Sequence, residues 1–279
     1  MLIGSYIKVL YFVCRISNVS YQRKFIFRNY KNELFLQWIK TYYFGCMMVA
    51  LKTLSLKIIR KGKSEGNNVS ISQAVIAGWT GRDLGKVKEH IKELQKLGIK
   101  PPTMMPLFYR VGVSRLTIAD KIEVTGTDSS GEAEFVILQI KDELFVGVGS
   151  DHTDRKVESF GITASKQLCN KPLSRNIWSF DEVVGHWDNL ILRSWIIRNN
   201  DRQLYQEGSL DNISRPEQLL ERFVNSGGVL LGGTVMFGGT VPAIGGIQPA
   251  ERFEFELEDP ILNRRLEHAY DISTLPIVE

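Results

Sequence analysis

The sequence predicts an α+β protein that is predominantly β and has a few helices. Short runs of alternating apolar and polar residues recur after residue 50, and glycine, asparagine or aspartate residues separate them. Helical spacing of apolar residues is less frequent, and no internal repeat or low-complexity tract is present. With 43% hydrophobic and 24% charged residues, the composition is that of an ordinary soluble globular protein.

The expected strands follow from this alternation and from the turn residues between them. Residues 61–68 contain glycines and asparagines and separate the first two strands, whereas residues 141–143 form a tight connection between two later ones. Residues 238–246 have the composition of a glycine-rich loop. The expected strands are 51–59, 69–77, 121–126, 132–140, 144–149, 190–199, 229–235 and 252–257.

Helices are expected in a few segments. Apolar residues at helical spacing, followed by Gly98, predict a helix at 83–97. Acidic residues begin a second helix near 181–186, and a proline followed by glutamate begins a third near 216–225. The prolines between residues 100 and 106 exclude regular structure there.

The first 47 residues differ in composition from the rest of the chain. They carry seven basic residues and one acidic residue, a net charge of +6, so the total of +4 leaves −2 for the remainder. They also hold 12 of the 28 aromatic residues (14 Phe, 5 Trp and 9 Tyr). We expect 1–47 to be an N-terminal extension that is wrongly included or disordered, with translation beginning at Met47 or Met48. Residues 48–279 are expected to form a single domain.

The composition of this extension permits two other interpretations. A signal or membrane segment at 6–19 would be interrupted by Lys8 and Arg15, and no small-residue cleavage site follows it. A basic arm for nucleic acid would use the aromatic residues that lie between the charges. Because the excess of positive charge is confined to this extension, we expect neither a membrane nor a nucleic-acid partner.

Cysteine and histidine usage narrows the possible chemistry. Cys14, Cys46 and Cys169 have no C-x-x-C spacing, so neither a disulfide scaffold nor a structural zinc site is indicated. The four histidines contain no H-x-x-x-H pair. We therefore expect a protein of the reducing cytoplasm, in which any metal site depends on carboxylates.

The segment 131–138 places two acidic residues on one face of an expected strand. Because side chains alternate along a strand, Glu132 and Glu134 point the same way, and Val136 and Leu138 continue that face. Carboxylates held close together on an inward face require a proton or a cation between them. The simpler alternative is an E-x-E pair at a strand end that only faces water.

A third acidic residue, Asp151, follows the next expected strand. If 132–140 and 144–149 pair, Asp151 returns to the neighbourhood of Glu132. Three carboxylates without sulfur or clustered imidazole suit Mg²⁺ or Mn²⁺. The sequence therefore predicts a metal site at Glu132, Glu134 and Asp151.

Four short motifs occur in order from about residue 125 to the end. They are Glu132-Ala-Glu134, Ser-Asp-His-Thr-Asp-Arg at 150–155, Ser-Lys-Gln-Leu-Cys-Asn-Lys-Pro at 165–172, and Phe-Gly-Gly-Thr-Val-Pro-Ala-Ile-Gly at 237–245. They resemble the E-x-E pair, the D-x-T-A-R-D motif, the K-x-x-D-x-x-x-P segment and the T-G-T-P-x-G-V-G loop of the fumarylacetoacetate hydrolase superfamily. Segments 77–83, 149–155 and 237–240 are similar, more closely, to the bacterial family named domain of unknown function 2848.

The resemblance implies a fumarylacetoacetate-hydrolase-like mixed β-roll and a metal-dependent enzyme, commonly a homodimer. The metal would chelate a small 2-oxo acid or 1,3-dicarbonyl of the acylpyruvate type and stabilise an enolate. Carbon–carbon hydrolysis, decarboxylation and hydration all begin in this way. Lys166 would be the active-site lysine and Thr240 a threonine that contacts the substrate. A non-catalytic metal- or ligand-binding module on the same fold is the alternative.

Other residues receive roles from their position or chemistry. His152, beside Asp151, is a candidate general base because imidazole titrates near neutrality, and a histidine that orients the hairpin is the alternative. Arg155 and Gly239 lie within the motifs and are expected to contact the substrate. Arg110 or Arg82 is a candidate for binding a distal carboxylate of the substrate.

Overall fold

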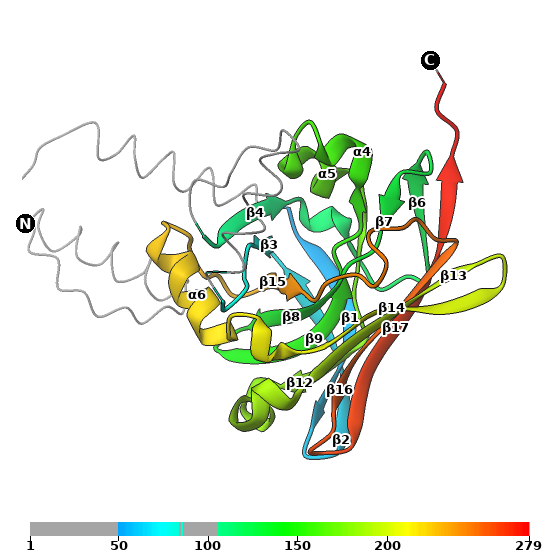
Figure 1. Cartoon of the computed structure of the whole chain (residues 1–279). Coiled ribbons are helices and arrows are strands. Elements are labelled where there is room, and N and C mark those ends of the chain that lie inside the picture. Colours follow the sequence, from blue (N-terminus) through cyan, green and yellow to red (C-terminus); the bar gives the residue numbers. More distant parts are fainter. Residues whose placement is uncertain (1–49, 84, 86–104, 279) are drawn as a thin grey trace, which may run out of the picture. The chain divides into compact units, whose positions relative to one another are not determined.

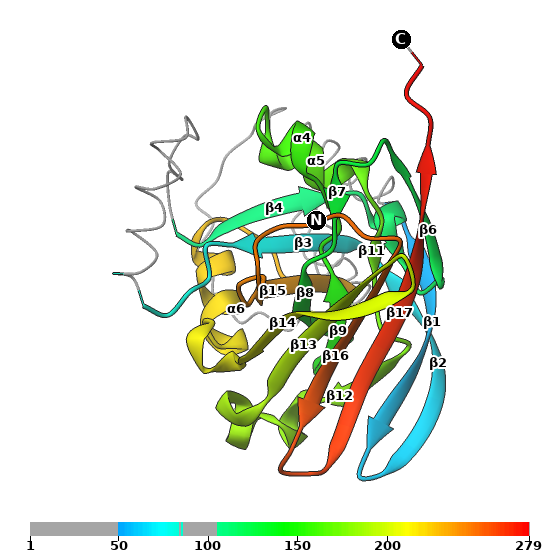
Figure 2. The ribbon, with the colours of Figure 1, turned by 45° about the vertical axis from the view of Figure 1, so that its right-hand side comes forward.

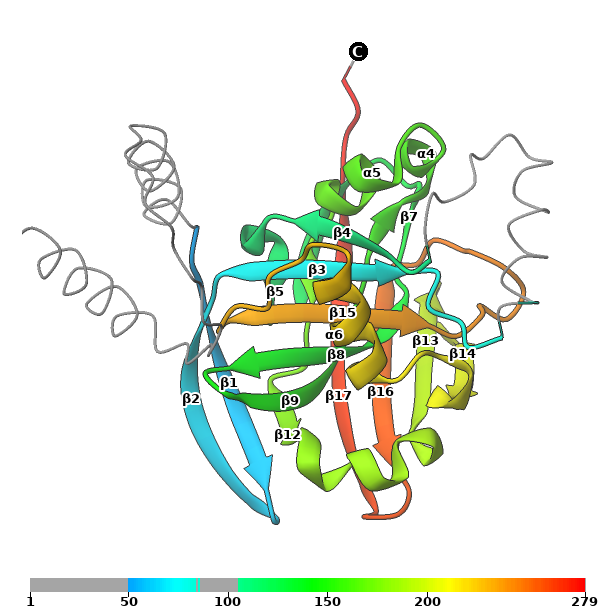
Figure 3. The same ribbon diagram turned by 90° about the vertical axis from the view of Figure 1, so that its left-hand side faces the viewer.

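The fold is built from two β-sheets, in a computed structural model that describes residues 50–83, 85 and 105–278 (Figure 1). The first sheet has eight strands in the order β2-β1-β12-β9-β8-β15-β3-β4. These strands are β1 (Lys52–Arg60), β2 (Lys63–Ile71), β3 (Gln73–Gly78), β4 (Leu107–Val111), β8 (Ala133–Ile140), β9 (Glu143–Ser150), β12 (Asn176–Ser179) and β15 (Thr234–Thr240). Figure 3 shows β4, β3, β15, β8 and β9 side by side in this sheet.

The second sheet has five strands in the order β14-β13-β16-β17-β6, and Figure 2 shows them side by side. They are β6 (Lys121–Thr125), β13 (Ile191–Arg198), β14 (Asp201–Ser209), β16 (Arg252–Asp259) and β17 (Arg264–Leu275). Two short pairs complete the sheets: β10 (Thr153–Asp154) with β7 (Ser129–Ser130), and β11 (Lys171–Pro172) with β5 (Leu116–Thr117). Strands dominate the described residues, which confirms the expected predominantly β fold class.

Helices are short and lie between the strands. The α-helices are α4 (Arg155–Glu158), α5 (Ile162–Leu168) and α6 (Pro216–Asn225), and the 3₁₀ helices are η1 (Val113–Arg115), η2 (Phe180–Glu182), η3 (Val184–Asn189) and η4 (Leu210–Asn212). Helix α6 packs through Phe223, whose ring lies edge-on to that of Phe108 in β4 at 5.2 Å between centroids. None of the described helices has the length and apolar composition that crossing a membrane requires.

Strand β8 is buried on both faces, and this places the functional residues. Phe135 and Ile137 pack into one apolar core with β13, β16 and β17 of the second sheet. Val136 and Leu138 pack into a second core, formed with β1, β2 and β3 on the other side of the first sheet. Because side chains alternate along a strand, Glu134 extends the face that faces the second core.

Most strand predictions are confirmed to within one or two residues. Those at 51–59, 121–126, 132–140, 144–149, 190–199 and 252–257 correspond to β1, β6, β8, β9, β13 and β16, and the helix predicted at 216–225 is α6. Strands β14 and β17 and helices α4 and α5 were not predicted. The helix predicted at 83–97 falls outside the described residues, apart from 83 and 85, as does the extension 1–47.

Two strand predictions are wrong in their boundaries. The turn after β1 is only Lys61 and Gly62, whose φ angles of 49° and 71° suit a two-residue hairpin, so 63–68 belong to β2 and the strand predicted at 69–77 is broken at Ser72. The helix predicted near 181–186 is formed by two 3₁₀ helices, η2 and η3. The strand predicted at 229–235 begins only at Thr234 and continues as β15 into the expected glycine-rich loop.

Gly238 lies in β15, where an aromatic ring occupies the space that a side chain at this position would need. A Cβ atom at this position would lie 2.1 Å from the ring of Phe135. We therefore predict that Gly238→Ala lowers the free energy of unfolding by about 1–3 kcal/mol, since the ring or the strand must move. Urea denaturation measures this change. Gly66→Ala, in β2 with no atom within 4 Å of the new methyl, is the control and should be nearly neutral. Equal effects of the two substitutions would contradict the prediction.

Candidate active site

The hairpin of β8 and β9 brings the predicted acidic residues together. Glu134 pairs with Gly149 across the two strands, and the backbone N–H of Asp151 donates to the carbonyl oxygen of Glu132 at 2.9 Å. A side chain at position 149 would lie 2.7 Å from the ring of Phe237 and 2.9 Å from the carbonyl oxygen of Pro172, so only glycine fits there. The expected return of Asp151 to Glu132 is confirmed.

Glu134 is buried, with 3% of its surface exposed. Its Oε2 accepts a hydrogen bond of 2.7 Å from the backbone N–H of Gly239. Burial, and then the negative charges of Asp151 and Glu132, raise its pKa well above the ordinary value, although Lys166 acts in the other direction. A cation beside this carboxyl would relieve the cost of ionising it.

Gly239 holds Glu134 through a backbone shape that favours glycine. Its φ is 113°, and a Cβ atom would lie 1.9 Å from Oγ1 of Thr80. The backbone of residue 239 is thus pressed between Thr80 and the carboxyl of Glu134. Gly239, which is expected from the sequence to contact the substrate, donates its N–H to a glutamate of the site.

Asp151 is fully buried and bound by two lysines. Its Oδ2 contacts the Nζ atom of Lys166, and its Oδ1 lies 3.0 Å from the Nζ atom of Lys171. Burial alone would raise the pKa of Asp151, but the two ammonium groups outweigh it and hold this pKa below its ordinary value. Sequence reasoning missed Lys171, although this second lysine lies in the same motif as Lys166.

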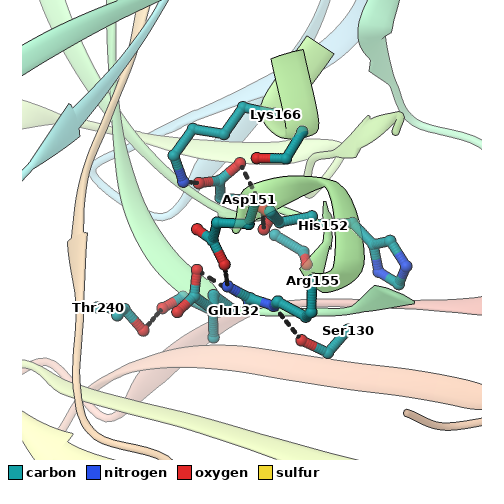
Figure 4. A network of polar contacts seen from close by, with 12 residues as sticks. Ser130, Glu132, Asp151, His152, Arg155, Lys166 and Thr240 are labelled. Carbon is teal, nitrogen blue, oxygen red and sulfur yellow. Dashed lines mark hydrogen bonds and ion pairs between the residues drawn. The ribbon is translucent and has the colours of Figure 1, made fainter. Parts of the chain in front are cut away.

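Lys166 projects from α5 toward Asp151 (Figure 4). Burial would lower its pKa, but the charges of Asp151, Glu132 and Glu134 together raise it. The ring of Tyr109 in β4 lies beside the ammonium group, 5.9 Å from centroid to Nζ. Lys166 therefore remains charged and balances part of the negative charge of the carboxylate cluster, which we define as Glu132, Glu134 and Asp151.

Arg155 pairs with the first glutamate of the cluster. One terminal nitrogen lies 3.1 Å from Oε2 of Glu132, another donates to Glu158 at 2.9 Å, and Nε donates to Oγ of Ser130 at 2.7 Å (Figure 4). Arg155 begins α4, and Asp154 caps this helix by accepting from the N–H of Val157 at 2.9 Å. The aspartate where the superfamily motif has alanine thus stabilises the turn that directs Arg155.

The backbone between the two glutamates is held by side chains. Thr240 Oγ1 donates to the carbonyl oxygen of Ala133 at 2.8 Å and accepts from Nε2 of Gln206 at 2.6 Å. Gln206 Oε1 accepts from the N–H of Ala133 at 2.9 Å. These bonds replace ladder bonds that β15 does not supply, since its pairing with β8 shifts register between Phe237 and Thr240. Thr240 supports the cluster, and Gln206 is a supporting residue that sequence reasoning missed.

His152 lies apart from the carboxylates (Figure 4). Its Nδ1 is 2.8 Å from the hydroxyl of Tyr270 and its Nε2 is 2.9 Å from Oγ of Ser129. Burial, and then the positive charges of Lys171 and Arg155, lower its pKa to about 3. These contacts favour the orienting role of His152 over that of a general base.

Arg110 does not join the cluster. It precedes Val111 at the end of β4, and its side chain is exposed. Tyr109, its neighbour in the strand, faces Lys166, so Arg110 points to the opposite face of the sheet.

Two surface hollows lie away from the carboxylates. One lies beside Ser55, Asn67 and Arg175, and the other lies on the second sheet around Trp195 and Glu256.

The donor set of the cluster fits a hard divalent cation, provided that its internal ion pairs open. Among the described residues, no three acidic, cysteine or histidine side chains are arranged to hold a metal ion directly. Instead Lys166 lies among the carboxylates and Arg155 binds Glu132. Carboxylate oxygens are the ligands that Mg²⁺ and Mn²⁺ prefer, and a cation would replace the charge that Lys166 supplies.

Comparison of the sequence with protein families identifies one match. The sequence profile of a family described as Protein of unknown function (DUF2848) matches residues 77–270. No curated protein matches the chain in sequence. The matched range includes the hairpin of β8 and β9 and all three carboxylates.

Solved structures share the fold at low sequence identity. A proposed fumarylacetoacetate hydrolase family protein from Yersinia pestis CO92 is 17% identical, with a TM-score of 0.55, over 77% of this chain and 99% of that one. A proposed fumarylpyruvate hydrolase from Burkholderia cenocepacia is 16% identical, with a TM-score of 0.52, over 82% and 99%. 2-Keto-3-deoxy-D-arabinonate dehydratase, in complex with magnesium and 2,5-dioxopentanoate, is 13% identical, with a TM-score of 0.52, over 78% and 86%. These similarities confirm the expected fold.

The burial of His152 has a consequence for stability. Above pH 6.5, its ordinary pKa, the imidazole is neutral in both the folded and the unfolded chain. Between pH 6.5 and about 3 only the unfolded chain binds the proton, so stability falls as the pH falls. We predict that the free energy of unfolding of His152→Gln depends less on pH in this range, by up to about 1.4 kcal/mol per pH unit. Urea denaturation of both proteins at pH 6.5, 5.5 and 4.5, with a chelator present, measures it. Parallel pH profiles would contradict the prediction.

Proposed function

The chain belongs to the family described as Protein of unknown function (DUF2848), and from its carboxylate cluster we propose that it is a metal-dependent enzyme. The proposed substrate is a small 2-oxo acid or a 1,3-dicarbonyl acid of the acylpyruvate type. The reaction is a carbon–carbon hydrolysis, a decarboxylation or a hydration. Mg²⁺ or Mn²⁺ is the proposed cofactor, and a cytoplasmic homodimer remains part of the proposal.

The observation that carries the proposal is the grouping of three carboxylates near Lys166, whose ammonium group contacts Asp151 and interacts through its charge with Glu132 and Glu134. Placing carboxylates this close together raises the free energy of the folded protein unless positive charge balances them. Because stability alone does not require such a cluster, the cluster indicates a functional site. Binding of magnesium and 2,5-dioxopentanoate by the dehydratase of the same fold supports the choice of cation and substrate class. Mg²⁺ or Mn²⁺, when bound, would polarise the keto oxygen of the substrate as a Lewis acid.

The residues of the chain would bind and orient the substrate. Lys166, released from Asp151, would donate a hydrogen bond to the keto oxygen, on which negative charge develops. Arg155, released from Glu132 but still held by Ser130, would bind the substrate carboxylate through a planar pair of N–H groups. Gly239 and Thr240 would keep Glu134 and Ala133 in place, so that the carboxylates do not move when the ion pairs exchange.

Binding of Mn²⁺ and then of oxalate, a mimic of the planar 2-oxo acid, tests this site in the full-length protein. We predict that Glu132→Gln combined with Glu134→Gln weakens Mn²⁺ binding on the order of 100-fold or more, because neutral amides are poor ligands for this ion. Isothermal titration calorimetry measures both steps. The matched control is Glu123→Gln combined with Glu221→Gln, two exposed glutamates. A folded wild-type protein that binds neither Mn²⁺ nor oxalate would overturn the proposal.

A non-catalytic metal- or ligand-binding module is the second candidate. The position of His152 favours it, because both ring nitrogens are engaged away from the cluster. Turnover of a panel of 2-oxo acids and acylpyruvates, with Mg²⁺ and with Mn²⁺, separates the two functions. For an enzyme we predict metal-dependent product formation that Lys166→Met reduces at least 100-fold, a loss typical of an oxyanion donor. Metal binding without turnover of any panel member would favour the module.

A further inference from the structure

The two lysines that bind Asp151 differ in their freedom to move. Lys166 contacts Oδ2 from α5, and 9% of its side chain is exposed. Lys171 contacts Oδ1 from β11, and its side chain is not exposed at all. Its Nζ atom also donates to the carbonyl oxygen of His152. One oxygen of Asp151 therefore faces an exchangeable cation, and the other faces a cation that is enclosed by the protein.

The backbone around Lys171 fixes this second ion pair. Strand β11 pairs in parallel with β5, with Lys171 opposite Leu116, and the next residues run against β9, where Leu173 bridges to Gly149. Moving the ammonium group away from Asp151 would leave that ammonium group unpaired in the interior, which costs several kcal/mol, and would remove one of the two cations that bind Asp151. Lys171 therefore stays on Oδ1 while Lys166 is able to leave Oδ2.

We infer that Lys171 is a positioning residue that sets the affinity of the proposed metal site, an inference that rests on the proposed function. By occupying Oδ1 it leaves Oδ2 as the oxygen of Asp151 that turns to a cation. Its positive charge, paired with Asp151, repels a divalent cation and attracts an anionic chelator. The cation alone consequently binds weakly, and a chelating dianion strengthens its binding.

Two neutral substitutions test the inference. Lys171→Met keeps the length of the side chain and suits a buried position, and Lys171→Gln retains a hydrogen-bond donor for Asp151. Titrations of the full-length proteins with Mn²⁺, without and with saturating oxalate, give two affinities for each protein. We predict that both variants bind Mn²⁺ alone at least 10-fold more tightly than wild type. The factor by which oxalate strengthens Mn²⁺ binding should shrink at least 10-fold.

The control is Lys121→Met, which removes an exposed lysine of β6 and should leave both affinities unchanged. Equal Mn²⁺ affinity in wild type and the Lys171 variants, or weaker binding in the variants, overturns the role of Lys171 and leaves the proposed function intact. A wild-type protein that binds Mn²⁺ neither alone nor with oxalate overturns both.

Unfolding without metal tests the ion pair itself and remains informative if a variant binds no metal. Lys171→Met should lower the melting temperature, because Asp151 loses one of its two cations. Adding Asp151→Asn should restore part of this loss, since the buried carboxylate that lost one of its cations is then replaced by a neutral amide. Additive losses in the double variant would overturn the inference.

Discussion

The grouping of three carboxylates, two of them buried, at one end of the β8–β9 hairpin is the constraint to which the surrounding structure responds. Glu134 and Asp151 are removed from water, and such charges are tolerated only when cations or hydrogen bonds compensate them. The compensating cations Arg155, Lys166 and Lys171 all come from α4, α5 and β11, directly after Asp151 in the sequence. One continuous stretch of chain therefore supplies the third carboxylate and the positive charges that make its burial possible.

Charge compensation alone would not hold the carboxylates at fixed positions, and the second sheet supplies the rest. Gln206 of β14 binds the N–H of Ala133 in the first sheet, and Ser194 of β13 binds the same amide oxygen of Gln206 at 2.7 Å. Thr240 of β15 donates a hydrogen bond to the carbonyl oxygen of the same Ala133. The geometry of the two glutamates consequently depends on how the sheets pack, and a local hairpin by itself would not reproduce it.

Much of the fold and part of the site could be predicted from local sequence. Alternation along 132–140 and 144–149 was sufficient to pair β8 with β9 and to bring Asp151 back to Glu132, because period-two patterning and a tight turn are local properties. The predicted limits of β15 were wrong because the glycine at position 238 does not mark a loop. The ring of Phe135, which lies on another strand, leaves no space for a side chain there. The contributions of Lys171 and Gln206 depend on long-range contacts, namely the pairing of β11 with β5 and the hydrogen bond from Ala133 to Gln206, which local patterns do not encode. His152 shows the same limit, since adjacency to Asp151 did not reveal that its ring faces Tyr270.

The ion pairs that make the cluster stable also determine how it would accept ligands. Lys166 and Arg155 are long side chains at the edge of the buried region, so each is able to exchange a carboxylate of the protein for an oxygen of a bound molecule. A divalent cation would take the place of Lys166 on Asp151, and an anionic substrate would then satisfy the released Lys166 and Arg155. Binding of the cation alone, or of the acid alone, would leave charges unpaired in a region that is largely closed to water. In the proposed site, the cation and the acid therefore bind together. The cation replaces Lys166 on Asp151, the acid pairs with the released Lys166 and Arg155, and every charge keeps a partner.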